Sequence, residues 1–352
     1  MLIRLNECSS LESVWWDSMK LETLSDKVIT SHIGSFPLEY SLENIERIIH
    51  DLAKIGIDIP PYPQLRDFIE VYVQPLEKAK LVYREGKHYR ANTDTLLESK
   101  PPQVSIVDIE YARNILAKYR FKSWRAPITG VFTIASKIYI DDPSRSIWAT
   151  VVNCKEILLS FLKEYVVNIV KYAYSLGYRF IVLDEPILTN IVGARRILFN
   201  YTVDELIELY DSIFKSIPRD TLTGIHVCGR IPPKLHEILC QIPSLKVLSH
   251  EFKGTPENIN TIRRDLLEKY DKILSPGIVS SKNPVIESYN ETMKLLTLLV
   301  ERFGNRVNIV TPDCGFAALR ATTRSLEDAY RLSLEKLKVI VNVARSFKTK
   351  SS

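Results

Sequence analysis

Residues 222–251 read LTGIHVCGRIPPKLHEILCQIPSLKVLSHE and contain one complete strand–helix–strand unit. Leu222–Val227 and Lys246–His250 are short apolar runs with β-branched residues, which predict strands. Pro233–Gln241, between them, has apolar residues at helical spacing behind an N-terminal proline. Parallel α/β sheets are built from units in this order, so we expect parallel strands joined by helices.

The alternation continues outward from this unit in both directions. Further strands are expected at Val28–Ile33, Ile57–Pro60, Ala126–Thr133, Phe180–Asp184, Lys272–Ile278 and Val307–Thr311. Further helices are expected at Leu42–Ile55, Leu65–Leu81, Asp108–Tyr119, Val151–Leu176, Val203–Ile217, Glu257–Tyr270, Val285–Phe303 and Ser325–Arg345. Eight strands, each followed by a helix, predict an α/β fold of the (β/α)8 TIM-barrel type. A doubly wound open sheet is the alternative, but no Gly-x-Gly-x-x-Gly follows the first strand.

The expected domain organisation is a short N-terminal arm, residues 1–27, followed by one barrel, residues 28–352. The polar stretch 84–105, broken by Pro101 and Pro102, predicts an excursion from the barrel. The net charge is only +5 over 352 residues, so neither nucleic acid nor a membrane surface is an expected partner. The sequence lacks a signal-peptide pattern and a long apolar run, so we expect a cytoplasmic protein with reduced cysteines.

Metal-ligand side chains gather where the expected strands end. His226 and Cys228 are two residues apart on one strand and therefore face the same side. Glu251 and Cys314 follow two other strands, and the carboxyl ends of barrel strands meet at one rim. One His, two Cys and one carboxylate suit a tetrahedral Zn²⁺ site. The alternative is that His226, Cys228 and Cys314 are core residues, because a lone His-x-Cys is a weak signal.

Zinc held by two thiolates is electron-rich and is a poor Lewis acid for hydrolysis. It is suited instead to binding an incoming thiol and stabilising its thiolate near neutral pH. The ligand set therefore predicts alkyl transfer to sulfur.

Five motifs in this order resemble the C-terminal, catalytic barrel of cobalamin-independent methionine synthase. They are Ile33-Gly34-Ser35-Phe36-Pro37, Asp184-Glu185-Pro186, His226-x-Cys228, Glu251 and Pro312-Asp313-Cys314-Gly315. The resemblance covers nearly all of the chain after about Thr30 and corresponds to a single-barrel form of the family.

The resemblance implies roles for these residues. His226, Cys228, Glu251 and Cys314 match the family's zinc ligands. Ile33, Gly34 and Ser35 match the segment that holds the carboxylate of homocysteine, and Asp184 matches the carboxylate that receives its ammonium group.

Three positions depart from the family pattern. Gln64 stands where the family has a second carboxylate for the ammonium group. Lys282 stands where the family has a His that assists proton delivery, and we expect a catalytic role for it; Lys137 stands where a Trp stacks on folate. A Lys offers no flat surface for a pterin ring. The methyl donor is therefore expected to be methylcobalamin, free or carried by a corrinoid protein, or a methyl-tetrahydropterin or folate stacked on another aromatic such as Tyr62 or Phe316.

We accordingly expect a zinc-dependent transferase that methylates homocysteine to methionine, with a separately encoded second barrel as a further conceivable partner. The alternative is a non-catalytic barrel subunit that binds metal or thiol and assists a partner methyltransferase, but such a subunit should have lost a ligand. A decarboxylase of the uroporphyrinogen type is a third hypothesis. It would need arginines around the cavity mouth, and Arg125, Arg195 and Arg196 are few and scattered.

Overall fold

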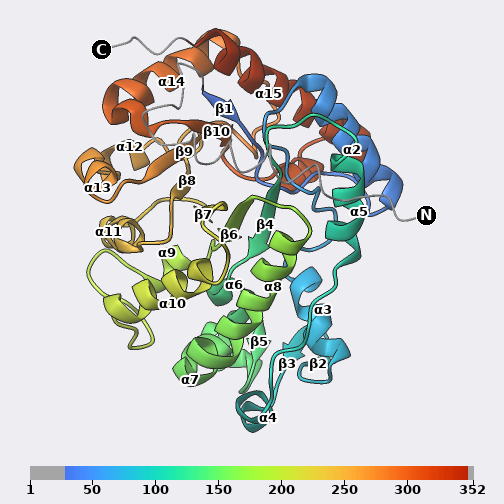
Figure 1. The fold of residues 1–352 in the computed structure, drawn as a ribbon, viewed down its shortest axis with the longest axis vertical. Helices are drawn as coiled ribbons and strands as arrows, with labels where there is room; N and C mark the ends of the chain where they lie inside the picture. The colour runs from blue at the N-terminus through green and yellow to red at the C-terminus, as the bar shows by residue number, and fades with distance from the viewer. Residues whose placement is uncertain (1–27, 348–352) are drawn as a thin grey trace.

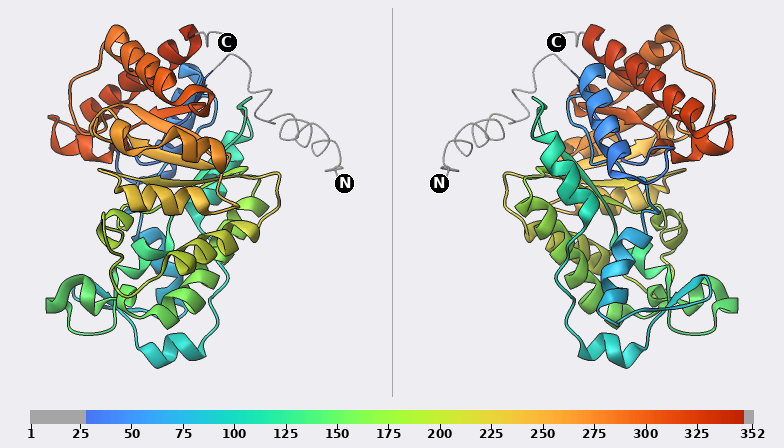
Figure 2. Two further views of the ribbon diagram at one scale, coloured as in Figure 1. Left: turned by 90° about the vertical axis from the view of Figure 1, so that its left-hand side faces the viewer. Right: turned by 90° about the vertical axis from the view of Figure 1, so that its right-hand side faces the viewer.

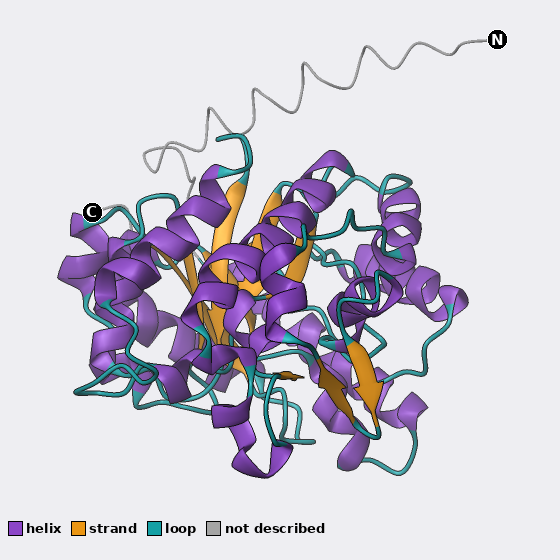
Figure 3. Ribbon diagram, turned by 90° about the horizontal axis from the view of Figure 1, so that it is seen from below, coloured by secondary structure: helices purple, strands orange, loops and turns teal. Residues whose placement is uncertain are grey.

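The computed structural model describes residues 28–347, so the expected arm at residues 1–27 lies outside the described part. The centre of the fold is one curled, parallel sheet of seven strands with helices around it (Figures 1 and 3). In spatial order the strands are β1 (Ile29–Thr30), β10 (Ile309–Pro312), β9 (Ile273–Val279), β8 (Val247–Glu251), β7 (Leu222–Val227), β6 (Phe180–Asp184) and β4 (Arg125–Thr129). The α/β class expected from the sequence is confirmed.

The strand expected at Ile57–Pro60 is wrong as a regular strand. Residues 59–64 instead make isolated parallel bridges to both edges of the sheet, at Ser31–Ile59, Ser35–Gln64 and Pro61–Arg125. The segment contains Pro60, Pro61 and Pro63, which lack the N–H groups of a continuous ladder. A complete eight-stranded barrel is therefore not confirmed, although this segment lies between the two edge strands.

Most helices lie close to their predicted positions. The longer ones are α2 (Leu42–Ile55), α3 (Glu70–Lys78), α5 (Val107–Leu116), α8 (Lys163–Ser175), α10 (Val203–Lys215), α11 (Pro233–Gln241), α14 (Tyr289–Phe303) and α15 (Leu326–Ser346). Their ends follow local chemistry: Ser41 caps α2 through its side chain, and Gly56 ends it in the left-handed conformation. Capping boxes at Thr202 and Ser288 begin α10 and α14.

The strand expected at Val28–Ile33 is shorter, Ile29–Thr30, and three further predicted elements also differ from the structure. The strand expected at Ala126–Thr133 ends at Thr129, and α6 (Val131–Ala135) follows because Glu185 accepts hydrogen bonds from the N–H groups of Phe132 and Thr133. The helix expected at Glu257–Tyr270 is two short helices, α12 (Asn258–Thr261) and α13 (Arg264–Lys269). The helix expected at Val151–Leu176 is divided into a 3-10 turn (Val151–Asn153), α7 (Lys155–Ile157), a π-helical turn (Leu158–Leu162) and α8.

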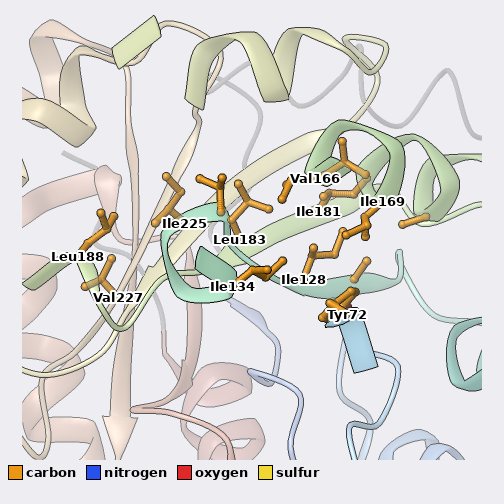
Figure 4. Packing of buried hydrophobic residues seen from close by; sticks show 14 of the residues in the cluster. Tyr72, Ile128, Ile134, Val166, Ile169, Ile181, Leu183, Leu188, Ile225 and Val227 are labelled. Atoms are coloured by element: carbon orange, nitrogen blue, oxygen red, sulfur yellow. The ribbon is translucent and has the colours of Figure 1, made fainter. Parts of the chain in front are cut away.

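Two hydrophobic clusters lie on opposite faces of the sheet. Outward-facing strand residues such as Ile128, Ile181 and Ile225 pack against the surrounding helices (Figure 4). Residues that alternate with them, including Phe180 and Val182, form a small separate cluster on the concave face. The concave face is apolar near the amino ends of the strands and polar near their carboxyl ends, where the candidate site lies.

The stretch 84–105 leaves the main sheet (Figure 2). It contains most of an antiparallel pair, β2 (Tyr83–Glu85) with β3 (His88–Arg90), and α4 (Thr93–Glu98); β3 also pairs with β5 (Ile138–Tyr139). Among the described residues, no helix combines the length and apolar character needed to cross a bilayer.

Candidate metal and substrate site

Three metal-ligand side chains converge at the carboxyl ends of β7 and β10. The His226 Nε2 atom lies 3.0 Å from the Cys228 Sγ atom, which lies 3.3 Å from the Cys314 Sγ atom. The three ligand atoms lie within 4.8 Å of one another. Residues 86 positions apart in sequence therefore share one cluster.

Hydrogen bonds around the cluster fix its geometry. Ser249 Oγ lies 3.1 Å from His226 Nδ1, so the other ring nitrogen, Nε2, faces the thiols. Asn258, completely buried, donates to the carbonyl oxygens of Gly229 and Glu251 and thereby ties the loop after β7 to the end of β8.

Asp313 fastens the third strand end to the other two. Its carboxylate accepts hydrogen bonds from the N–H groups of Phe252, Lys253 and Gly254, directly after β8. A Cβ atom at Gly277 would lie 2.4 Å from the Asp313 Cα atom, so this close approach requires glycine. The residue next to Cys314 therefore holds the loop that follows Glu251.

Glu251 ends β8 and is 3% exposed. Its Oε2 atom accepts a hydrogen bond from Thr255, whereas the enclosed Oε1 atom has no hydrogen-bond partner among the described residues. Lys282, whose side chain is 70% exposed, reaches within 3.7 Å of Oε1. Glu251 is not part of the compact three-residue cluster, but it has one oxygen free to act as a ligand.

The two thiols differ electrostatically. The hydrogen bond from Cys228 lowers the pKa of Cys314 well below its usual range, against the opposing effect of burial, and His226 acts in the same direction as Cys228. Cys314 is therefore the thiol that ionises first. A thiolate is the form of cysteine that binds metals.

Asp184 ends β6 beside His226, its register partner on β7. Burial raises the pKa of Asp184 to about 7, and the positive charges of His226 and Arg125 partly offset this. The Arg125 guanidinium lies 3.9 Å from the Asp184 Oδ1 atom. The sequence gives no sign of this contact, because Arg125 begins β4, at the opposite end of the strand from the site.

The segment Ile33–Ser35 forms a tight turn at the end of β1. Gly34 has a φ of +149°, and a Cβ atom there would lie 2.6 Å from the Gln64 Oε1 atom, so the position requires glycine. The Gly34 N–H donates to His32 Nδ1, and the Ser35 hydroxyl accepts a hydrogen bond from the Ala317 N–H. The Gly34 N–H is therefore already engaged, which leaves Ile33 and Ser35 as the donors of this turn.

Gln64 lies against the same turn and is bridged to Ser35. Its Nε2 atom donates to the Tyr62 hydroxyl and to the Pro127 carbonyl oxygen. The side-chain oxygen consequently faces Gly34 and stays free to accept a hydrogen bond. The carboxylate of Glu185, in contrast, has a structural role. It accepts hydrogen bonds from Thr133 and Tyr210 and from the start of α6.

The aromatic residues suggested as a stacking surface do not offer one. Tyr62 is 1% exposed with its hydroxyl bonded to Tyr72, and Phe316 is completely buried against His32. That expectation is wrong, because both rings belong to the packed interior. Trp148, in the 3-10 helix Pro143–Ala149, is 48% exposed.

A His/Cys/Cys cluster beside a buried carboxylate, at the carboxyl ends of a parallel sheet, is the arrangement of a candidate metal site in an α/β enzyme. The family model of the cobalamin-independent synthase catalytic domain matches residues 108–345. The chain belongs to this family, so the resemblance drawn from the sequence is confirmed, and with it the enzyme class, homocysteine methyltransferases of the methionine synthase type.

Two curated relatives are consistent with this assignment. A methionine synthase from Sulfolobus acidocaldarius is 22% identical over 282 residues, which cover 77% of this chain and 74% of the relative. A 5-methyltetrahydropteroyltriglutamate–homocysteine methyltransferase from Nitrobacter winogradskyi is 23% identical over 62% of this chain. That match spans only 26% of the Nitrobacter protein.

Solved structures share the fold at low sequence identity. A structure from Listeria monocytogenes described as a vitamin-B12 independent methionine synthase has a TM-score of 0.66 and 13% identity, covering 91% of this chain and 97% of that one. A B12-independent methionine synthase from Shewanella sp. W3-18-1, solved with selenomethionine, has a TM-score of 0.62 and 16% identity, covering 91% and 98%.

Proposed function

We propose that this chain is a zinc-dependent S-methyltransferase that transfers a methyl group to the thiol of homocysteine and forms methionine. The observation that carries the proposal is the His226–Cys228–Cys314 cluster beside the buried carboxylate of Asp184. The family assignment supports the same acceptor. We further propose that residues 57–64 complete an eight-stranded (β/α)8 barrel, since they bridge both edge strands.

His226, Cys228 and Cys314 would hold the zinc ion, and Glu251 would supply the fourth ligand. The enclosed Oε1 atom of Glu251 fits this role, because it accepts no hydrogen bond within residues 28–347 and a buried carboxylate oxygen without one is costly. When bound, Zn²⁺ stabilises the thiolate of the incoming thiol and so makes the nucleophile available near neutral pH. The free thiols suit the reducing cytoplasm, which we propose as the compartment.

The amino-acid part of homocysteine would lie between β1 and β6. Ile33 and Ser35 would bind its carboxylate through N–H groups and the Ser hydroxyl, while Asp184 would receive its ammonium group. Gln64 would add a neutral acceptor, since its oxygen faces the turn. Held in this way, the sulfur is oriented for in-line attack on the methyl carbon, and orientation is a large part of the catalysis.

Two methyl donors are considered, a methyl-tetrahydropterin and methylcobalamin. The Nitrobacter relative's name supports a methyl-tetrahydropterin donor, and the comparisons give no support for a corrinoid protein or a second barrel as partner. Lys137 and Lys282, both exposed, remain the argument for methylcobalamin. Lys282 would place a positive charge beside Glu251, an electrostatic part rather than a direct proton transfer.

The proposal is tested by measuring methionine formed from L-homocysteine with zinc-loaded protein. Methylcobalamin and triglutamyl methyl-tetrahydrofolate are supplied in parallel, with and without zinc. We expect zinc-dependent methionine formation, with methylcobalamin the better donor. If zinc-loaded protein formed no methionine with either donor, the proposed activity would be overturned. That result would favour a non-catalytic, metal-binding subunit.

A further inference from the structure

Arg125 is a buried charge for which the proposed chemistry has no use. It begins β4, its side chain is 0% exposed, and none of its three guanidinium nitrogens finds a hydrogen-bond acceptor among residues 28–347. Burying a cation without hydrogen bonds is unfavourable unless a nearby anion offsets the cost. The arrangement therefore calls for a functional reason.

The guanidinium of Arg125 lies on the interior side of Asp184, beneath the proposed amino-acid site. Arg125 pairs in register with Phe180 at the start of β6, and its Cζ atom lies 5.3 Å from the Phe180 ring. The side chain nevertheless reaches Asp184 at the other end of β6, with Nη2 3.9 Å from Oδ1. Arg125 thus extends along the concave face from the amino ends of the strands toward their carboxyl ends.

The strand next to β4 supplies the surroundings of this side chain. β4 pairs in register with β6 from Arg125–Phe180 to Thr129–Asp184, so one strand provides both the ring beside the guanidinium and the carboxylate that it approaches.

Asp184 has two differently placed sides. Its Oδ1 atom is enclosed, has no hydrogen-bond partner among the described residues, and faces Arg125. The side chain as a whole keeps 10% of its surface exposed, so the rest of the carboxylate faces the site. A carboxylate can accept from two cations at once, since it has about four lone-pair positions.

We propose that Arg125 is a positioning residue for the acceptor amino acid: it holds the inner oxygen of Asp184 and so presents the outer oxygen to the ammonium group. This inference rests on the proposed function, because it presumes an amino-acid substrate. It also explains how one carboxylate serves where Gln64 has replaced the second, as the orientation of Asp184 then matters more.

The test uses L-methionine binding, which needs neither a donor nor a metal ion and is measured by calorimetry on the full chain. We expect Arg125→Met and Arg125→Gln to weaken L-methionine binding about tenfold, and Arg125→Lys to restore it to within about threefold. In an Asp184→Asn background the same changes should alter binding less than about twofold, since coupled residues are not additive. Arg306→Gln, which removes a cation paired with Asp271, is the matched control.

The companion ligand is 4-(methylthio)butanoate, which lacks the ammonium group and should bind equally to all Arg125 variants. Equal loss for both ligands, or the same loss with and without the Asp184 carboxylate, would overturn the inference and assign Arg125 a purely structural or carboxylate-binding role. Should Arg125→Met fail to fold, Arg125→Gln and Arg125→Lys carry the same comparison. Absence of L-methionine binding to the unaltered protein would instead count against the proposed function.

Discussion

The thiol-accepting side and the donor-facing side of the site are built differently. On the accepting side, which comprises His226, Cys228, Glu251, Cys314 and Asp184, His226 is 1% exposed and Glu251 is 3% exposed. Lys282, on the proposed donor-facing side, has a side chain that is 70% exposed. Lys137 is also exposed, but it lines a separate hollow together with His88 and Tyr89. Asn258 and Asp313 fix the accepting side with buried hydrogen bonds, so its geometry is set before any substrate arrives. Substitutions there should consequently have large effects, and those on the donor-facing side small ones.

The largest effect is expected for Cys314→Ser and Cys228→Ser. The unaltered protein should bind one zinc ion per chain, and either variant should lose more than about 100-fold in zinc affinity, since even outer partners of a metal ligand contribute 10–100-fold. Elemental analysis of protein purified without chelator measures this. Cys240→Ser, which alters a buried cysteine beside His236, should keep its zinc. Unchanged zinc content in both ligand variants would remove the metal site from the account.

The next effect concerns the acceptor amino acid. Asp184→Asn should raise the KM for homocysteine about 10–150-fold while zinc stays bound, since a charge-assisted contact contributes about 1.5–3 kcal/mol. Steady-state kinetics together with zinc analysis measures it. Unaltered KM would mean that the ammonium group is bound elsewhere.

A pH dependence follows from the same residue. Burial raises the pKa of Asp184 to about 7, and only the ionised carboxylate attracts an ammonium group. Affinity for L-methionine is therefore present above pH 7 and declines as the pH falls through it, by about tenfold between pH 8 and pH 6. Calorimetry at several pH values tests this, and Asp184→Asn should flatten the profile. A steep profile that persists in Asp184→Asn would assign the titration to another group.

The smallest effect is expected for Lys282→Met. Its ion pair with Glu251 is exposed on the lysine side, and such pairs contribute about 0–1 kcal/mol, which corresponds to less than about fivefold in kcat. A residue that carries the transferred proton would cost about 10²–10⁴-fold instead. Measuring kcat for Lys282→Met beside Lys137→Met distinguishes the two, and a loss of the larger size would give Lys282 a direct catalytic part.

The same contrast explains what the sequence could predict. His226, Cys228 and Cys314 are recognisable because ligand chemistry restricts their identity and parallel strands bring their ends together. Gln64 is bridged directly to Ser35, and its part in binding the substrate stays a prediction. The role of Arg125 depends on the path of a long side chain across the sheet, which no local pattern encodes.

The misjudged elements have equally physical causes. Prolines at 60, 61 and 63 turned the expected second strand into a bridging segment. Asn258 donates a hydrogen bond to the carbonyl oxygen of Glu251 at the end of β8. The helix expected around Asn258 is divided into α12 and α13. Tyr62 and Phe316 were suggested as stacking surfaces from their positions alone, whereas packing had buried both.

We infer that the accepting side binds a thiol amino acid through its metal ligands without help from the donor-facing side. Calorimetric comparison of L-homocysteine with L-homoserine tests this most directly, because the two differ only in sulfur against oxygen. We predict that zinc-loaded protein binds L-homocysteine at least about tenfold more tightly and that zinc removal abolishes the difference. Equal binding of the two ligands to zinc-loaded protein would mean that the metal site does not bind the thiol of the substrate.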